Sequence, residues 1–241
     1  MTDAILKNWT KAKRASQVFV ITHSYLNFAQ RREAPYVSLK RAWARHILRH
    51  LNVNLKIKGT LPPSEGPWVL VGNHLSYLDI PVLVMAIPEL CFLSKSEISK
   101  WPLIGRGARA MDTIFVDRNS VRSRDQAKIS VTNQLRRKRS KLCIFPSGTT
   151  SLKESVRWNK GAFEIAKSCP CQIIPFRLTY QPLEPIAYID RDIFLAHLFQ
   201  LVGLGSIEVT IEFGTPAIVD EPIIATQNTK QWSEVNNGNA F

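Results

Sequence analysis

The stretch Val69-Leu-Val-Gly-Asn-His-Leu-Ser-Tyr-Leu-Asp79 passes from an apolar run, through a polar turn, to the start of a helical segment. The apolar run, Trp68–Val71, is typical of a strand that is buried on both faces. The segment 79–87 has the length of a short helix. A strand that leads through a turn into a helix is the repeating unit of α/β folds, so this stretch predicts that class.

The chain on both sides of this stretch repeats the alternation. Further segments of strand length lie at Leu90–Leu93, Ile114–Val116, Leu142–Phe145 and Ile173–Leu178, and strictly alternating segments lie at 53–57 and 207–213. Segments of helical length lie between them, at about 97–109, 120–139 and 160–168. We therefore expect a mixed, largely parallel sheet of about seven strands with flanking helices.

The 241 residues are enough for one large domain with short additions at its ends. Residues 1–52 are basic and have helical spacing, which predicts a short pair of helices. Residues 53–225 hold the strands and helices of the expected α/β domain. Residues 226–241 form a polar segment that we expect to be frayed.

Charge is unevenly distributed along the chain. It has 32 Lys+Arg and 19 Asp+Glu, a formal net charge of +13. Residues 1–60 hold 12 basic and two acidic residues, and residues 118–141 hold nine and one. This excess indicates an anionic partner, such as a membrane surface, a phosphorylated substrate or nucleic acid. Because the basic run Arg136–Arg139 accompanies no nucleic-acid-binding motif, we expect no nucleic-acid partner.

Residues 40–53 have the pattern of an amphipathic helix. Trp43, Ile47, Leu48 and Leu51 share one side, and three arginines lie beside it at four-residue steps. Two interpretations remain open. The helix could lie in an anionic bilayer interface, with contacts from Arg41, Trp43, Arg45 and Arg49. Alternatively, its apolar side could pack on the core of the domain itself.

No segment has the roughly 20 mostly apolar residues of a membrane span, and we expect no signal peptide. The cysteines Cys91, Cys143, Cys169 and Cys171 have neither redox nor zinc-site spacing. We therefore expect four reduced thiols in a cytosolic compartment and no metal.

His74 and Asp79 follow the predicted strand at 68–71, and the carboxyl end of a strand is where α/β folds expose reactive groups. A carboxylate bonded to one imidazole nitrogen fixes the tautomer and leaves the other nitrogen free to accept a proton. Both residues also fit structural roles. Asp79 could cap the helix that contains Pro81, and His74 could be an ordinary turn residue.

Two other predicted strands end in polar residues. The strand at 142–145 leads into Pro146-Ser147-Gly148 and three hydroxyl residues, which could hold an oxyanion or a phosphate, or form a plain polar turn. The strand at 114–116 is followed by Arg118. Its guanidinium suits a bidentate phosphate contact, or an ion pair with Asp117 or Asp125.

In this order and spacing, the segments resemble the glycerophosphate/lysophosphatidate acyltransferase family, in particular bacterial-type lysophospholipid acyltransferases. Residues 73–79 match the family's first motif, Asn-His-x4-Asp. Residues 114–118 are similar to the second motif, residues 145–151 to the third and residues 173–176 to the fourth. The resemblance covers about residues 40–215.

The resemblance implies an O-acyltransferase that moves a fatty acyl group from acyl-CoA or acyl carrier protein to a lysolipid hydroxyl, with lysophosphatidate as the favoured acceptor. His74 would deprotonate the hydroxyl, Asp79 would orient His74, and amides near Gly148 or in the His74 turn would hold the oxyanion. No cofactor or metal is implied. The implied substrate-binding residues are Arg118, Lys95, Ser147, Gly148, Thr149 and Lys160. The enzyme would be peripheral, on the cytoplasmic face of an anionic membrane.

The third motif departs from the family pattern, which usually reads Phe-Pro-Glu-Gly-Thr and is often followed by Arg. Here Ser147 replaces the Glu, and Thr150 stands in the position of the Arg. Two charged groups usually associated with acceptor binding are therefore missing. A lysolipid without a phosphate-bearing glycerol, such as lyso-ornithine lipid, remains an alternative acceptor.

Overall fold

The structure is a computed structural model, and it describes residues 2–31, 36–138, 140–152, 157–169, 171–189 and 192–234. In this part of the chain, seven strands form one sheet in the order β1-β7-β6-β2-β5-β3-β4. Their bounds are β1 Val53–Lys58, β2 Trp68–Gly72, β3 Leu90–Lys95, β4 Ile114–Val116, β5 Lys141–Ile144, β6 Gln172–Gln181 and β7 Ile207–Phe213. Among these seven described strands, the β6–β7 pair alone is antiparallel, so the predicted mixed, largely parallel sheet is confirmed.

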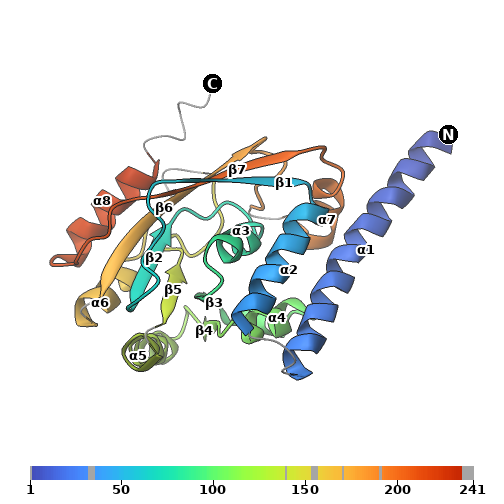
Figure 1. Ribbon diagram of the computed structural model, residues 1–241. Helices are drawn as coiled ribbons and strands as arrows, with labels where there is room; N and C mark the ends of the chain where they lie inside the picture. Colours follow the sequence, from blue (N-terminus) through green and yellow to red (C-terminus); the bar gives the residue numbers. More distant parts are fainter. Residues whose placement is uncertain are drawn as a thin grey trace.

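Helices cover both faces of the sheet (Figure 1). One face carries α2 (Tyr36–His50), α3 (Asp79–Ala86) and α7 (Phe194–Leu201), and the other carries α5 (Val121–Lys138), α6 (Gly161–Ser168) and α8 (Pro222–Glu234). The central strand β2 serves both. Trp68 and Leu70 belong to the core under α2 and α3, while Val69 and Val71 belong to the core under α5 and α6. Because successive side chains of a strand point to opposite faces, β2 is a continuous apolar run.

The helix expected at about 97–109 is two shorter elements, a 3₁₀ helix η1 (Ser96–Lys100) and α4 (Ile104–Ala110). Pro102 lies between them, and Leu103 has a left-handed backbone with φ of 61°. Proline lacks the amide that a continuous helix needs, so the two elements separate there.

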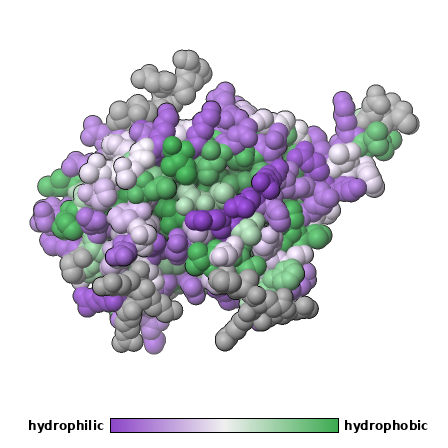
Figure 2. Space-filling view, in the orientation of Figure 1, coloured by the Kyte–Doolittle hydropathy of each residue, from purple (hydrophilic) through white to green (hydrophobic). Residues whose placement is uncertain are grey.

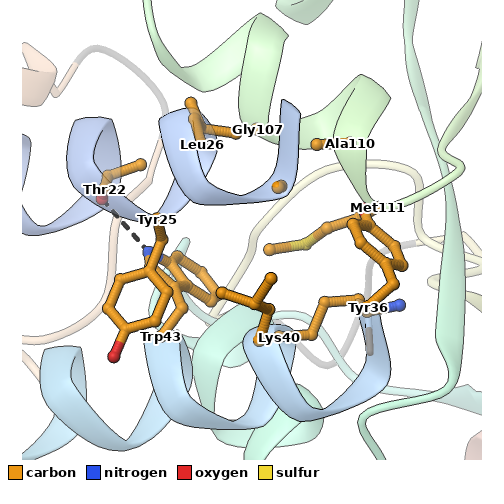
Figure 3. Close-up of a pocket in the computed structure, with 11 residues that line it drawn as sticks. Thr22, Tyr25, Leu26, Tyr36, Lys40, Trp43, Gly107, Ala110 and Met111 are labelled. Atoms are coloured by element: carbon orange, nitrogen blue, oxygen red, sulfur yellow. Dashed lines mark hydrogen bonds between the residues drawn. The ribbon is translucent and has the colours of Figure 1, made fainter. Parts of the chain in front are cut away.

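Helix α2 packs its apolar side on the domain, as the second of the two sequence interpretations predicts. Ala44, Ile47 and Leu48 are buried in the core. Trp43, expected to contact a membrane, instead faces the long helix α1 (Thr2–Arg31), where its indole donates a hydrogen bond to Thr22 (3.2 Å; Figure 3). The core and α1 thus cover much of the apolar side of α2, and a membrane contact of the partly buried Trp43 stays a prediction.

Helix α1 is longer than the short element expected, and it lies outside α2 and α7 (Figure 1). The Arg14 side chain donates to the carbonyl oxygens of Val202 (2.6 Å) and His50 (2.8 Å). The ring of His50 in turn bonds the carbonyl oxygen of Arg14 at 2.9 Å. These bonds hold the middle of α1 against the ends of α2 and α7. Within the described residues, no helix combines the length and the apolar character that crossing a bilayer requires.

The segment expected to be a frayed tail differs in the structure. Residues 226–234 belong to α8, and residues 235–241 lie outside the described residues. Thr226, Thr229 and Ser233 are buried, and the Ser233 hydroxyl donates to the carbonyl oxygen of Phe176 (3.2 Å). These small polar residues allow α8 to pack on the sheet although its composition is polar.

Candidate active site

His74 lies in the turn that joins β2 to α3, at the carboxyl end of a central strand. Its Nδ1 is 2.7 Å from Oδ2 of Asp79, the first residue of α3. The Asp79 side chain is fully buried, whereas 19% of the His74 side chain is exposed. With the Nδ1 proton held by the carboxylate, Nε2 is the nitrogen left to accept a proton from a substrate.

The Asp79 carboxylate accepts three further hydrogen bonds. Oδ2 accepts from the amides of Leu75 (2.8 Å) and Ser76 (3.2 Å), and Oδ1 accepts from the Tyr180 hydroxyl (2.7 Å). Because these two amides precede α3, the Asp79 carboxylate does not cap that helix. The capping role was the alternative that the sequence left open for Asp79. Burial and the charge of Asp79 raise the pKa of Tyr180 well above its ordinary value, so the phenol keeps its proton and remains a donor.

Tyr180 was not predicted from the sequence. It lies near the end of β6 and outside all four motifs, and only the pairing of β6 with β2 brings its strand beside the His74 turn. The same neighbouring strand holds Asn73, whose side-chain amide exchanges two 2.8 Å hydrogen bonds with the backbone of Leu178. The pairing of β2 with β6 thus fixes both ends of the first motif.

The third motif contacts His74 directly. The Phe145 ring stacks on the imidazole, with ring centroids 3.8 Å apart. The amide of Ser151 donates to the His74 carbonyl oxygen at 2.9 Å. The Asp79 carboxylate therefore holds Nδ1 of His74, and the Phe145 ring covers one face of the imidazole. Together these contacts leave the His74 ring little rotational freedom.

Arg118 joins the second motif to the turn of the third. Its guanidinium donates to the carbonyl oxygen of Gly148, a residue with φ of 72° where a Cβ atom would collide with the guanidinium. The positive φ and the lack of space for a Cβ atom therefore both require glycine at position 148. The carboxylate of Asp117, one of the two ion-pair partners considered for Arg118, accepts a hydrogen bond from the amide of Asn119 (3.0 Å). Burial lowers the pKa of Arg118 from its ordinary value. Arginine side chains nevertheless stay charged in proteins.

The amides expected to hold an oxyanion are already engaged. The Gly148 amide donates to the Phe145 carbonyl oxygen at 2.9 Å, and the amides of Leu75 and Ser76 donate to Asp79. The Ser147 hydroxyl donates to the Thr149 carbonyl oxygen (2.7 Å), so it too serves its own turn. These contacts build the turn rather than an anion site.

A groove of about 940 Å³ opens beside this turn, between α5 and α6, and Phe145 and Pro146 form part of its wall. Its volume lies in the range of ligand-binding sites. Of the implied substrate-binding residues, Arg118, Gly148 and Lys160 line it. Lys95, Ser147 and Thr149 are not among its lining residues. Lys160 forms an ion pair with Glu164 at 3.2 Å.

The four cysteines are free and buried. Burial raises the pKa of Cys143 well above its ordinary value and the pKa of Cys171 to about 11. Since the thiolate is the nucleophilic form of cysteine, these two thiols are poorly suited to attack a substrate.

A family model described as Acyltransferase matches residues 52–179. A lyso-ornithine lipid O-acyltransferase of Pseudomonas aeruginosa is 35% identical over 180 residues, which span 72% of this chain and 68% of that protein. A 1-acyl-sn-glycerol-3-phosphate acyltransferase of Neisseria meningitidis serogroup B is 30% identical over 107 residues, or 44% of this chain and 41% of that one. The crystal structure of the 1-acyl-sn-glycerophosphate acyltransferase PlsC of Thermotoga maritima superposes with a TM-score of 0.70. That superposition covers 96% of this chain and 93% of the other at 16% identity, so it supports the fold.

Proposed function

This chain belongs to the acyltransferase family, and from that premise we propose that His74 is the general base that activates a lysolipid hydroxyl. The observation that carries the proposal is the 2.7 Å contact between His74 Nδ1 and a fully buried Asp79 carboxylate. A buried carboxylate at this distance keeps the proton of His74 on Nδ1, which leaves Nε2 free to accept a proton. The same carboxylate stabilises the imidazolium that forms during transfer.

Acyl transfer then takes place in one direct step, followed by protonation of the leaving group. Nε2 of His74 takes the hydroxyl proton while the hydroxyl oxygen attacks the thioester carbonyl carbon. The new C–O bond forms, the C–S bond breaks, and the thiol of CoA or of acyl carrier protein leaves with the proton from His74. A covalent intermediate on Cys143 is disfavoured, because that thiol is fully buried and its pKa is raised.

The acceptor that we propose is a lyso-ornithine-type lipid, rather than the lysophosphatidate that the sequence alone favoured. The substitution of Ser147 in the third motif supports this choice, because its hydroxyl is used within the turn and adds no charge for a phosphate. The 35% identity to a relative of that name adds support. Such a lipid presents one carboxylate, and the single guanidinium of Arg118 can pair with it in bidentate fashion. Lysophosphatidate remains the second candidate, because Arg118 also suits a phosphate and the Neisseria relative carries that name.

The experiment is an acyl-transfer assay with purified protein, a labelled acyl thioester and both lysolipids. We expect transfer to lyso-ornithine lipid with a kcat/KM at least about ten-fold above that for lysophosphatidate, a difference worth about 1.4 kcal/mol. A preference for lysophosphatidate would replace the first candidate with the second, and transfer to no lysolipid would contradict the function itself.

We further propose that the enzyme works as a peripheral protein on the cytoplasmic face of an anionic membrane. Large apolar residues are exposed on α1 and at the start of α7, namely Ile5, Leu6, Trp9, Ile193 and Leu195. Figure 2 shows hydrophobic side chains at the surface along the side where α1 lies, interspersed with hydrophilic ones. Arg41, Arg45 and Arg49 are exposed on the neighbouring α2. Apolar side chains edged by arginines suit the interface of an anionic bilayer.

A further inference from the structure

Side-chain hydrogen bonds join the catalytic turn, residues 73–79, to two neighbouring elements. The two ends of the turn, Asn73 and Asp79, bond residues of β6. The middle of the turn is joined to α7, because the Tyr77 hydroxyl lies 3.0 Å from Nδ1 of His197. The bonds to β6 fix the turn at its ends, and the bond to α7 fixes it between them.

The proton positions in the Tyr77–His197 pair follow from the second contact of the imidazole. Nε2 of His197 lies 3.0 Å from the carbonyl oxygen of Ala187, which can only accept, so Nε2 carries a proton. In the neutral ring Nδ1 is then the acceptor, and the Tyr77 hydroxyl donates to it. Burial raises the pKa of Tyr77 above its ordinary value, so the phenol keeps the proton that it donates.

Aromatic rings pack around this pair. The Tyr77 ring makes edge contacts with Phe194, Tyr188 and His197, at centroid distances of 5.0, 5.3 and 5.4 Å. The rings of Tyr188 and His197 also contact each other at 5.4 Å. The backbone amide of Tyr188 donates to the carbonyl oxygen of Leu75, a residue of the catalytic turn. The surroundings of Tyr77 therefore pack directly against that turn.

The Tyr77–His197 bond supplies orientation more than stability. His197 is 7% exposed, and Tyr77 packs against the apolar core. A buried polar pair adds little net stability over apolar side chains of the same size, because both groups lose their contact with water. A hydrogen bond does fix a distance and a direction, which apolar contacts leave free. Tyr77 follows Ser76, whose amide donates to the Asp79 carboxylate, so its direction affects that contact.

We propose that His197 is a positioning residue of the active site, which holds the Tyr77 hydroxyl and thereby fixes the turn that sets the contact between His74 and Asp79. This inference rests on the proposed function, in which His74 is the general base. It adds a residue of α7, 120 residues from Tyr77 in the sequence, to the support of that base. His197 acts through Tyr77 and not on the substrate.

Two substitutions of His197 separate its two hydrogen bonds. In His197→Asn the side-chain oxygen takes the place of Nδ1 and can still accept from Tyr77, but the bond to Ala187 is lost. In His197→Gln the side-chain nitrogen takes the place of Nε2 and can still donate to Ala187, but the acceptor for Tyr77 is lost. Tyr77→Phe removes the bond between Tyr77 and His197 from the other side.

Steady-state kinetics provide the first measurement. We expect Tyr77→Phe and His197→Gln each to lower kcat about ten-fold, with the KM for both substrates within about two-fold of wild type. The double variant should lower kcat no further than either single variant, because both remove the same bond. His197→Asn should recover kcat to within about three-fold of wild type, because Tyr77 keeps its acceptor.

The matched control is a second tyrosine–histidine pair. The Tyr25 hydroxyl lies 2.7 Å from Nδ1 of His46, between α1 and α2. Tyr25→Phe therefore removes the same type of bond outside the catalytic turn, and we expect its kcat to stay within about two-fold of wild type.

Unfolding in urea separates a positioning role from a merely structural one. His197→Asn and His197→Gln each lose one hydrogen bond, so their urea midpoints should fall by similar amounts, whereas their kcat values should differ. The positioning role would be overturned by a kcat that follows the urea midpoint across the variants. It would also be overturned by His197→Asn being as impaired as His197→Gln, or by a wild-type kcat in Tyr77→Phe.

A measurement that needs no turnover is the NMR signal of the His74 Nδ1 proton, which lies in the contact with Asp79. We expect this signal to be broadened or lost in Tyr77→Phe and His197→Gln, because a loosened turn lets the proton exchange faster with water. The signal should be kept in His197→Asn and in Tyr25→Phe. An unchanged signal in Tyr77→Phe and His197→Gln would overturn the proposal.

The two proposals fail in distinguishable ways. Transfer that requires His74 but proceeds at the wild-type kcat in Tyr77→Phe would contradict the positioning role of His197 alone. Wild-type protein that acylates no lysolipid, with an Nδ1 proton signal lost in His197→Gln and kept in His197→Asn, would contradict the proposed function. In that case the link from His197 to the catalytic turn would still stand.

Discussion

Tyr180 and Asp79 are 101 residues apart in the sequence, and the Tyr180 hydroxyl donates a 2.7 Å hydrogen bond to Oδ1 of the Asp79 carboxylate. Both side chains are buried. The other carboxylate oxygen, Oδ2, contacts His74 Nδ1 at the same distance. A residue of β6 therefore fixes the carboxylate that orients the proposed base, and we treat Tyr180 as a positioning residue.

Tyr180→Phe should lower kcat about ten-fold and leave the KM for both substrates nearly unchanged, because one donor to a buried carboxylate is worth roughly 1–3 kcal/mol. The acid limb of the kcat/KM profile should move to higher pH, since a carboxylate that has lost a donor stabilises the protonated imidazole more strongly. Tyr25→Phe is the matched control, since the Tyr25 hydroxyl bonds His46 far from the site. An unchanged kcat and pH profile would contradict the positioning role.

Arg118→Ala should raise the KM for the lysolipid acceptor about ten-fold or more and leave the donor KM unchanged, because a charge-assisted bidentate contact is lost. Arg109→Ala is the control, since Arg109 also donates to a backbone carbonyl oxygen, that of Ser99, but outside the groove. If lyso-ornithine lipid were acylated with the same KM by Arg118→Ala and by wild type, its carboxylate would not be the group that Arg118 binds.

The attachment to membranes should depend on the apolar residues of α1. Leu6→Ser/Trp9→Ser should weaken binding to anionic vesicles about ten-fold or more, because each buried large side chain contributes about 1.5–3 kcal/mol. Leu61→Ser/Ile218→Ser removes two equally apolar exposed residues elsewhere and should have little effect. Vesicle sedimentation measures both, and high salt should weaken binding by wild type because it screens Arg41, Arg45 and Arg49. Equal loss in the two variants would contradict a specific role of α1.

The thiols should be inert in the folded protein. All four cysteines are buried, and burial raises the pKa of Cys143 and Cys171, so the thiolate fraction at pH 8 is small. Iodoacetamide at pH 8 should leave activity unchanged, and mass spectrometry should find four alkylated cysteines only after unfolding in denaturant. Any residual alkylation should become faster with each unit of pH above 8, because the thiolate fraction keeps rising until the pH reaches the raised pKa of a thiol. Rapid inactivation at pH 8 would indicate a thiol that takes part in the reaction.

The strands and the first motif were predictable because their signals are local. The buried run of β2 and the alternation in β7 depend only on which faces each strand buries, so the pattern of apolar residues reveals them. The five-residue spacing of His74 and Asp79 likewise lies within one turn, where a contact between the side chains is short-range.

Other features could not be predicted because they depend on tertiary packing. Tyr180 becomes a partner of Asp79 only through the pairing of β6 with β2. Trp43 faces α1 because α1 packs along α2, and the pattern of α2 alone cannot distinguish that helix from a bilayer. Helix α8 has a polar sequence, and its contact with the sheet through Ser233 is not visible in any periodicity.

The most direct test of the central claim is the rate of acyl transfer by His74→Ala, measured with a labelled acyl thioester and lyso-ornithine lipid under saturating conditions. Circular dichroism and vesicle binding confirm that the variant is folded and still attaches to membranes. The account predicts that kcat falls by about 10²–10⁴, the contribution of a positioned general base. Transfer by His74→Ala at the wild-type rate would contradict the assignment of His74 as the base.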